Sequence, residues 1–166
     1  WRLALETTDQ LQKTINMVVG SRLDDDTRRI ALAGNSELSR TVNAVLAADI
    51  NDQARRLALG NVGAYNVVVQ AALAPTVSDA VRRIVISQQG SYAAMITAAV
   101  DTRMPANERR ILLQQQGGYI TNISAVLDRD MPGPLRELVL NANTQAARAV
   151  TILATTPNLT DVTRTA

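Results

Sequence analysis

The residues best placed to do chemistry in this sequence are pairs of arginines that recur every 27 residues. The pairs are Arg28-Arg29, Arg55-Arg56, Arg82-Arg83 and Arg109-Arg110, and the next step holds Arg136-Glu137. A row of arginines at regular spacing can bind the phosphates of a nucleic acid. The first question is therefore whether these arginines face a ligand or serve the protein itself.

The same repeats place acids just before those arginines. Asp25, Asp52 and Asp79 each lie four residues before the second arginine of a pair. Acid before base at this spacing on a helix favours an ion pair, and an acid near a helix start also suits the helix dipole. With a net charge of only +2, we interpret the arginines mainly as ion-pair partners. The acid is missing at Ala106, so any anion should bind at Arg109 and Arg110.

Other chemistry has little support in the composition. The chain has no His and no Cys, which excludes imidazole bases, thiol catalysis and metal sites built from those ligands. It also lacks a Gly-rich phosphate loop and the HExxH pattern. Asp24-Asp25-Asp26 could attract a cation, but an acid run at a helix start is more often capping and solvated. We expect no catalytic residue, metal site or cofactor.

The spacing of the arginines is part of a longer tandem repeat. Residues 1–162 divide without gaps into six units: 1–27, 28–54, 55–81, 82–108, 109–135 and 136–162. A fixed period of this size is typical of a repeat array, in which each unit stacks on its neighbours. We expect one repeat domain across residues 1–166, and we expect it to be a piece of a longer array.

Two positions of each unit suggest helix starts. Position 24 holds Asp24, Asn51, Ser78, Pro105, Pro132 and Leu159, and position 9 holds Asp9, Ser36, Gly63, Gly90, Gly117 and Thr144. Most of these residue types favour an N-cap or the first turn of a helix. The stretch RRIVIS alone would suit a strand, but the alanine content favours helices. The sequence thus predicts an all-α, right-handed α-solenoid of six helix-turn-helix repeats, with about twelve short antiparallel helices.

Position 16 is polar in every unit, and we expect it to be the binding face. Polar side chains at solenoid spacing can hydrogen-bond an extended peptide. The predicted contacts are Asn43, Gln70, Thr97 and Ser124. The alternative is a face exposed to water alone.

Two further groups of residues recur. Position 11 carries Tyr65, Tyr92 and Tyr119, which we expect at the edge of the core with the hydroxyl outward. Gln88-Gln89 and Gln115-Gln116 precede glycines in the predicted turns, although glutamine is not a turn former.

Residues 52–83 resemble a known class of helical repeat. The shared features are an Asp-then-Arg helix start, a turn at Val62-Gly63-Ala64, and a second helix that ends in QAAL at Leu73. They resemble the ALF repeats, HEAT-like α-helical repeats of large, often secreted actinobacterial proteins. That resemblance implies a structural and protein-binding role in a bacterial protein. LGNVGAYN also resembles the loop of TAL-effector-like DNA-binding repeats, which would make Asn61-Val62 a base-reading pair.

The function expected from the sequence is that of a non-enzymatic helical-repeat scaffold or protein-binding segment. Its expected partner is a protein or extended peptide. The alternative is a nucleic-acid-binding repeat array that uses the arginines. No apolar run reaches the roughly 18 residues that a membrane span needs, so we expect no membrane partner. Secreted and cytoplasmic locations are both compatible with the sequence.

Overall fold

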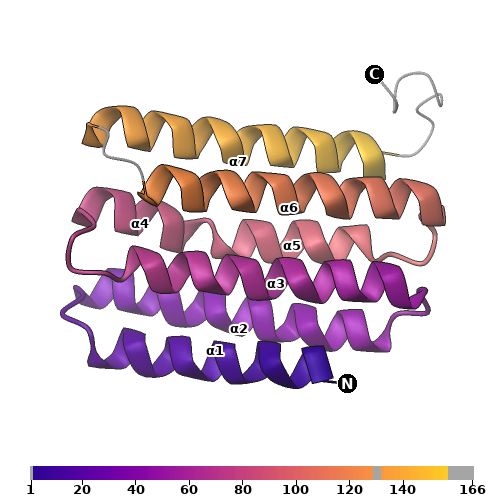
Figure 1. Ribbon diagram of the computed structural model, residues 1–166, viewed down its shortest axis with the longest axis horizontal. Coiled ribbons are helices and arrows are strands. Elements are labelled where there is room, and N and C mark those ends of the chain that lie inside the picture. Colours follow the sequence, from indigo (N-terminus) through magenta and orange to yellow (C-terminus); the bar gives the residue numbers. More distant parts are fainter. Residues whose placement is uncertain (1, 129–131, 157–166) are drawn as a thin grey trace.

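The computed structural model describes residues 2–128 and 132–156, and within these ranges it is all-α, with no strand. Figure 1 shows the helices stacked from α1 at one end to α7 at the other. Their bounds are α1 Arg2–Gly20, α2 Asp25–Ala47, α3 Asp52–Ala72, α4 Asp79–Ser87, α5 Gln89–Ala99, α6 Ala106–Asp128 and α7 Gly133–Thr155. The predicted helical class is therefore confirmed. None of the described helices is long and apolar enough to cross a membrane.

Each unit contributes one long helix, so the prediction of two short helices per unit is wrong. The helix α2, for example, runs without interruption from position 25 of one unit to position 20 of the next. The exception is the fourth unit, where Gln88 separates α4 from α5. The six units therefore supply six helical rods, one of them broken, in place of about twelve short helices.

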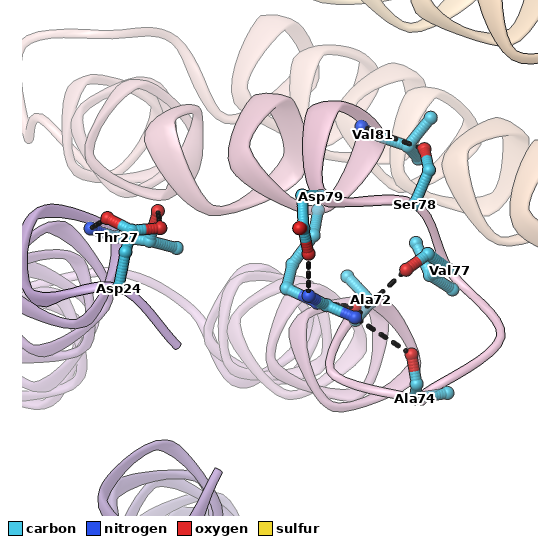
Figure 2. Close-up of polar contacts among 9 residues, drawn as sticks. Asp24, Thr27, Ala72, Ala74, Val77, Ser78, Asp79 and Val81 are labelled. Carbon is cyan, nitrogen blue, oxygen red and sulfur yellow. Dashed lines mark hydrogen bonds and ion pairs between the residues drawn. The ribbon is translucent and has the colours of Figure 1, made fainter. Parts of the chain in front are cut away.

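The predicted helix starts at position 24 are confirmed where the structure describes them. The side chains of Asp24, Asn51 and Ser78 accept hydrogen bonds from backbone N–H groups three residues later, at 2.8, 2.8 and 3.4 Å. Figure 2 shows the caps of Asp24 on Thr27 and of Ser78 on Val81. Pro105 and Pro132 directly precede α6 and α7. Leu159 lies outside the described residues.

Position 9 lies inside a continuous helix in every unit except the fourth, where α5 begins at Gln89 beside Gly90, and the glycines Gly63 and Gly117 serve packing between helices. The described helices run through all six residues at this position. A Cβ added at Gly117 would lie 3.0 Å from Oδ1 of Asn61, and one at Gly63 would lie 3.4 Å from Oε1 of Gln10. Both neighbours belong to the helix two units upstream. Glycine at these sites permits a close approach between helices and makes no turn.

The helices form two layers, because each helix packs both on the next one and on the one two units away. The helices α1, α3 and α6 make one layer, and α2, α4-α5 and α7 make the other. Short connections make successive helices antiparallel, so helices within a layer run parallel (Figure 1). One aliphatic core joins the layers, and its large fully buried side chains include Leu38, Ile86, Ile96, Leu113 and Leu140.

Candidate functional site

The first arginine of each pair closes the loop that precedes its own helix. Arg82 donates to the carbonyl oxygens of Ala72, Ala74 and Val77, at 3.1, 3.2 and 2.9 Å. Figure 2 shows these carbonyls converging beside Asp79. They include the last turn of α3 and the loop after it, where backbone acceptors have no partner within the helix. A guanidinium has five N–H donors in a planar fork and can satisfy several such acceptors together.

The same contact recurs at position 1 in other units. Arg28 donates to the carbonyl of Leu23 at 3.1 Å, and Arg55 donates to that of Ala48 at 3.1 Å. Arg109 donates to the carbonyls of Asp101 and Met104, both at 2.8 Å. The first arginine is therefore a structural residue of the loop.

The predicted ion pairs form at a different spacing. Asp25 pairs with Arg28 at 3.0 Å, and Asp52 pairs with Arg55 at 2.9 Å. Asp79 likewise pairs with Arg82. These acids lie three residues before the first arginine of each pair, whereas the sequence had suggested four residues before the second. The position-1 side chain is already held over the helix start by the loop carbonyls, which brings it next to the acid.

The acid run Asp24-Asp25-Asp26 is fully used by its own helix start. Asp24 caps Thr27, and its pKa is lowered because that carboxylate accepts hydrogen bonds from the Thr27 hydroxyl and backbone N–H. Asp26 pairs with Arg29 at 3.0 Å. Within residues 2–128 and 132–156, no three carboxylates are grouped as a metal site would require.

The structure does not bring Arg109 and Arg110 together as an anion site. Arg109 is only 4% exposed and is held by the loop carbonyls, whereas Arg110 lies exposed on the helix surface. The loop before them has its own ion pair, in which the Arg103 guanidinium lowers the pKa of Asp101 to about 2. The two side chains thus occupy different environments, and Arg110 is the one of the pair that a dissolved anion could reach directly.

The arginines also do not form a single stripe. Because successive helices are antiparallel, position 1 alternates between the two edges of the stack (Figure 1). Arg28 and Arg82 begin helices at one edge, and Arg55 and Arg109 begin helices at the other. A nucleic acid following one edge would meet only every second pair.

The four predicted position-16 contacts are likewise split between the two edges, and two of them are bonded to another helix. The Gln70 amide donates to Oγ1 of Thr14 at 2.9 Å, and the hydroxyls of Thr97 and Thr41 lie 3.1 Å apart. Both contacts join a helix to the parallel helix two units upstream.

Asn43 and Ser124, the other two predicted contacts, differ in exposure. Asn43 is exposed and Ser124 is half-buried. Adjacent helices run in opposite directions, so Asn43 and Gln70 lie about 20 Å apart along the helix axes, at 1.5 Å per residue. The four predicted contacts are therefore not one continuous row.

Buried polar side chains join parallel helices, and the sequence reasoning missed this role. Thr14 donates to Oδ1 of Asn66 at 2.7 Å, and Asn61 donates through Nδ2 to the carbonyl of Leu113 at 2.9 Å. Thr144 donates to Oε1 of Gln88 at 2.7 Å. Each pair spans 52 to 56 residues, close to two units. Gln88-Gln89 and Gln115-Gln116 could have indicated such contacts between helices, because glutamine is not a turn former and its place in a predicted turn had no other explanation.

Two of the position-11 tyrosines are fully buried, so the expected outward hydroxyl is wrong for them. Tyr65 and Tyr92 are stacked with ring centroids 4.6 Å apart. The Tyr65 hydroxyl donates to the carbonyl of Val85 at 2.7 Å, and the Tyr92 hydroxyl accepts from Asn143 at 3.1 Å. Burial raises the pKa of Tyr65 well above its usual value and also raises that of Tyr92. Tyr119 is half-buried.

An open cleft of about 390 Å³ lies where α1, the end of α2 and the start of α3 meet. Its lining combines apolar side chains with two ion pairs, Arg2–Glu6 at 2.8 Å and Arg55–Asp52 at 2.9 Å. The full lining is Arg2, Leu3, Glu6, Leu46, Asp52, Arg55, Arg56 and Leu59. Because four of its five charged side chains are already paired, the cleft presents no concentrated charge of one sign.

A scan against family models and searches of curated proteins and solved structures found no match to this chain. The turn on which both sequence resemblances depended is not formed, because Val62-Gly63-Ala64 lies inside α3. Asn61, expected at a base-reading position, is buried and bonded to Leu113. The geometry of the described residues is therefore the basis for a functional proposal.

Proposed function

We propose that this chain is a non-enzymatic helical-repeat scaffold that contacts proteins, an α-solenoid of six helical rods of which the fourth is broken at Gln88. The observation that supports the proposal is that the recurring polar side chains form hydrogen bonds and ion pairs within the protein. Position-1 arginines bind loop carbonyls, as Arg82 does, and the acids at the helix starts cap the helix or pair with those arginines. Position-14 and position-16 side chains join helices two units apart. The residues that repeat are thus those that build the stack.

An extended peptide would have to bind along one edge of a layer. Asn43 on α2 is exposed, and Thr97, also exposed, lies 54 residues later on α5 of the same layer. Polar side chains along such an edge can hydrogen-bond a peptide backbone. The ALF-like resemblance, which implies a large bacterial parent protein, remains a prediction beside this proposal.

Panning a phage-displayed library of unstructured peptides against the chain tests the binding role. We expect enriched peptides to lose affinity for the Asn43→Ala variant and to keep it for Asn107→Ala, which changes another exposed asparagine. Equal affinity for both variants would remove the position-16 edge from the proposal. A library that yields no binder would leave only the scaffold role.

The alternative function, nucleic-acid binding through the arginines, is not favoured by any contact described above. The position-1 guanidiniums are committed to loop carbonyls, and the pairs alternate between two edges. A gel shift with single- and double-stranded oligonucleotides at increasing salt tests it directly. Tight, salt-dependent binding at physiological salt would overturn the scaffold proposal.

A further inference from the structure

The burial of a side chain depends on where its unit lies in the stack. At position 5, Leu5 of the first unit is 65% exposed, Leu32 is half-buried, and all later residues are at most 4% exposed. Those later residues are Leu59, Ile86, Leu113 and Leu140. Position 5 therefore faces the units upstream, and among the described residues no unit lies on that side of Leu5.

Position 14 shows the opposite trend. Thr14, Thr41, Val68 and Met95 are at most 5% exposed, whereas Asn122 and Ala149 in the last two units are exposed. Position 3 follows the same course, half-buried in the first four units and exposed at Ile111 and Leu138. These positions face the units downstream.

The stack thus ends in two different surfaces that correspond to the two sides of its internal contacts. We name the upstream one the leading surface, on α1 and α2, with Leu5, Asp9, Gln12, Val19 and Asn43. We name the downstream one the trailing surface, on α6 and α7, with Ile111, Gln115, Asn122, Leu138 and Leu153. Figure 1 places α1 and α7 at opposite ends of the molecule. Both surfaces expose large apolar side chains, among them Leu5 and Val19 on one and Leu138 and Leu153 on the other.

We propose that the trailing surface of one copy binds the leading surface of a second copy, head to tail. This inference rests on the proposed scaffold function and names one partner for it. The second copy's α1 would lie on α6 as α6 lies on α3, and its α2 would lie on α7. The contact would extend the packing that already joins every helix to the helix two units away.

The polar side chains at the two ends match in the register used inside the stack. Inside the stack, Thr144 at position 9 donates to Gln88 at position 7, and Thr14 at position 14 donates to Asn66 at position 12. At the junction, position 7 is the exposed Gln115 and position 9 of the second copy is the exposed Asp9. An amide N–H₂ can donate to that carboxylate.

The second polar pair of the junction matches as well. Position 14 is Asn122 and position 12 of the second copy is Gln12, both exposed, and two amides can exchange hydrogen bonds. A second copy therefore offers apolar partners for the exposed Leu138 and Leu153 and a polar partner for Gln115, and it adds one for Asn122, which within the chain donates to Asn143 at 3.3 Å.

A head-to-tail contact uses two different surfaces, so it does not close into a symmetric dimer and growth can continue. Sedimentation velocity of the whole chain, from low micromolar to several hundred micromolar, should show species that grow with concentration and have no fixed size. A chain that stays monomeric across this range would overturn the proposal. Peptide binding by such a monomer would leave the scaffold proposal standing.

Three variants test which surface takes part in self-association. Leu5→Glu blocks the leading surface and Leu138→Glu the trailing surface, and each should weaken self-association at least about tenfold, because a carboxylate would be buried without a partner. Both side chains are 65% exposed in the single chain, so both variants should keep wild-type circular dichroism. Val67→Glu is the control, since position 13 is exposed in every unit and lies on neither surface.

Mixing the two blocked variants distinguishes head-to-tail contact from a symmetric one. Each retains one intact surface, so an equimolar mixture should form a one-to-one dimer and nothing larger. Self-association of either variant at the wild-type level would overturn the proposal. So would a mixture without heterodimer, or loss of association in Val67→Glu.

Discussion

Replacing Arg82 with alanine should destabilise the protein more than changing any exposed arginine. The variant removes three hydrogen bonds to the carbonyls of Ala72, Ala74 and Val77, from a side chain that is only 11% exposed. A hydrogen bond contributes about 0.5–1.5 kcal/mol net, and more when one group is charged. Because the freed loop carbonyls can partly reach water, we expect a loss of about 2–3 kcal/mol in the free energy of unfolding.

The assay is urea unfolding followed by circular dichroism at a helical wavelength, with thermal unfolding beside it. The predicted loss corresponds to a fall of about 5–10 °C in the midpoint for a chain of this size. Arg83→Ala is the matched control at the adjacent exposed position and should change stability by less than about 0.5 kcal/mol. Asp79→Ala should cost at most about 1 kcal/mol, because its carboxylate is almost fully exposed.

Arg82→Lys separates charge from geometry. Lysine keeps the positive charge but has no planar fork to donate to three carbonyls, so most of the loss should remain. If Arg82→Ala is as mild as Arg83→Ala, the loop-closing role of position 1 is wrong.

Three further predictions concern the packing between helices. Gly34→Ala should lower the free energy of unfolding by at least about 2 kcal/mol, because the new Cβ would lie 2.6 Å from Cβ of Gln89. Gly60→Ala is the matched control: its Cβ would meet open space, so this variant should raise the free energy of unfolding by about 0.5–1 kcal/mol. Gln70→Ala should lower the free energy of unfolding by about 1 kcal/mol, because it removes the hydrogen bond to Thr14. Asn43→Ala, which changes an exposed side chain, should lower it by less than about 0.5 kcal/mol. Equal effects of the two variants in urea unfolding would contradict their different roles. Burial raises the pKa of Tyr65, so the contribution of its protonated form to the free energy of unfolding is complete below about pH 10 and is lost at higher pH. Phenolate absorbance from Tyr65 should therefore appear together with the loss of helix in a titration to high pH. The Tyr65→Phe variant should lack that part of the absorbance change.

The sequence predicted the helical class and the outer limits of each helix well. The limits came from local chemistry: Asp24, Asn51 and Ser78 cap in the way that their residue types suggest. The repeat also predicted that acids at the helix starts pair with the arginines, but it assigned Asp25, Asp52 and Asp79 to the second arginine of each pair, whereas they pair with the first. Such features depend on residues only a few positions apart, so they can be recognised without knowledge of the packing.

The contacts between helices could not be predicted from local patterns. Gly63 and Gly117 look like turn residues, yet both lie within helices and face Gln10 and Asn61 two units upstream. Asn61 was expected in a loop from the resemblance of LGNVGAYN, whereas it lies within α3 and bonds the backbone of a residue 52 positions away. A small or polar residue in mid-helix has two explanations, and only the packing partner decides between them.

The number of helices per unit explains why both predicted binding rows failed as rows. A unit with two helices returns the chain to its starting edge, so every position 1 and every position 16 would lie on the same side. A unit with one helix reverses direction each time, so equal positions alternate between edges and recur on one edge only every 54 residues. Asn43 and Thr97 share an edge in this way, and Gln70 and Ser124 share the other. The structural repeat is therefore two units long, and any ligand that follows this array must match that doubled spacing.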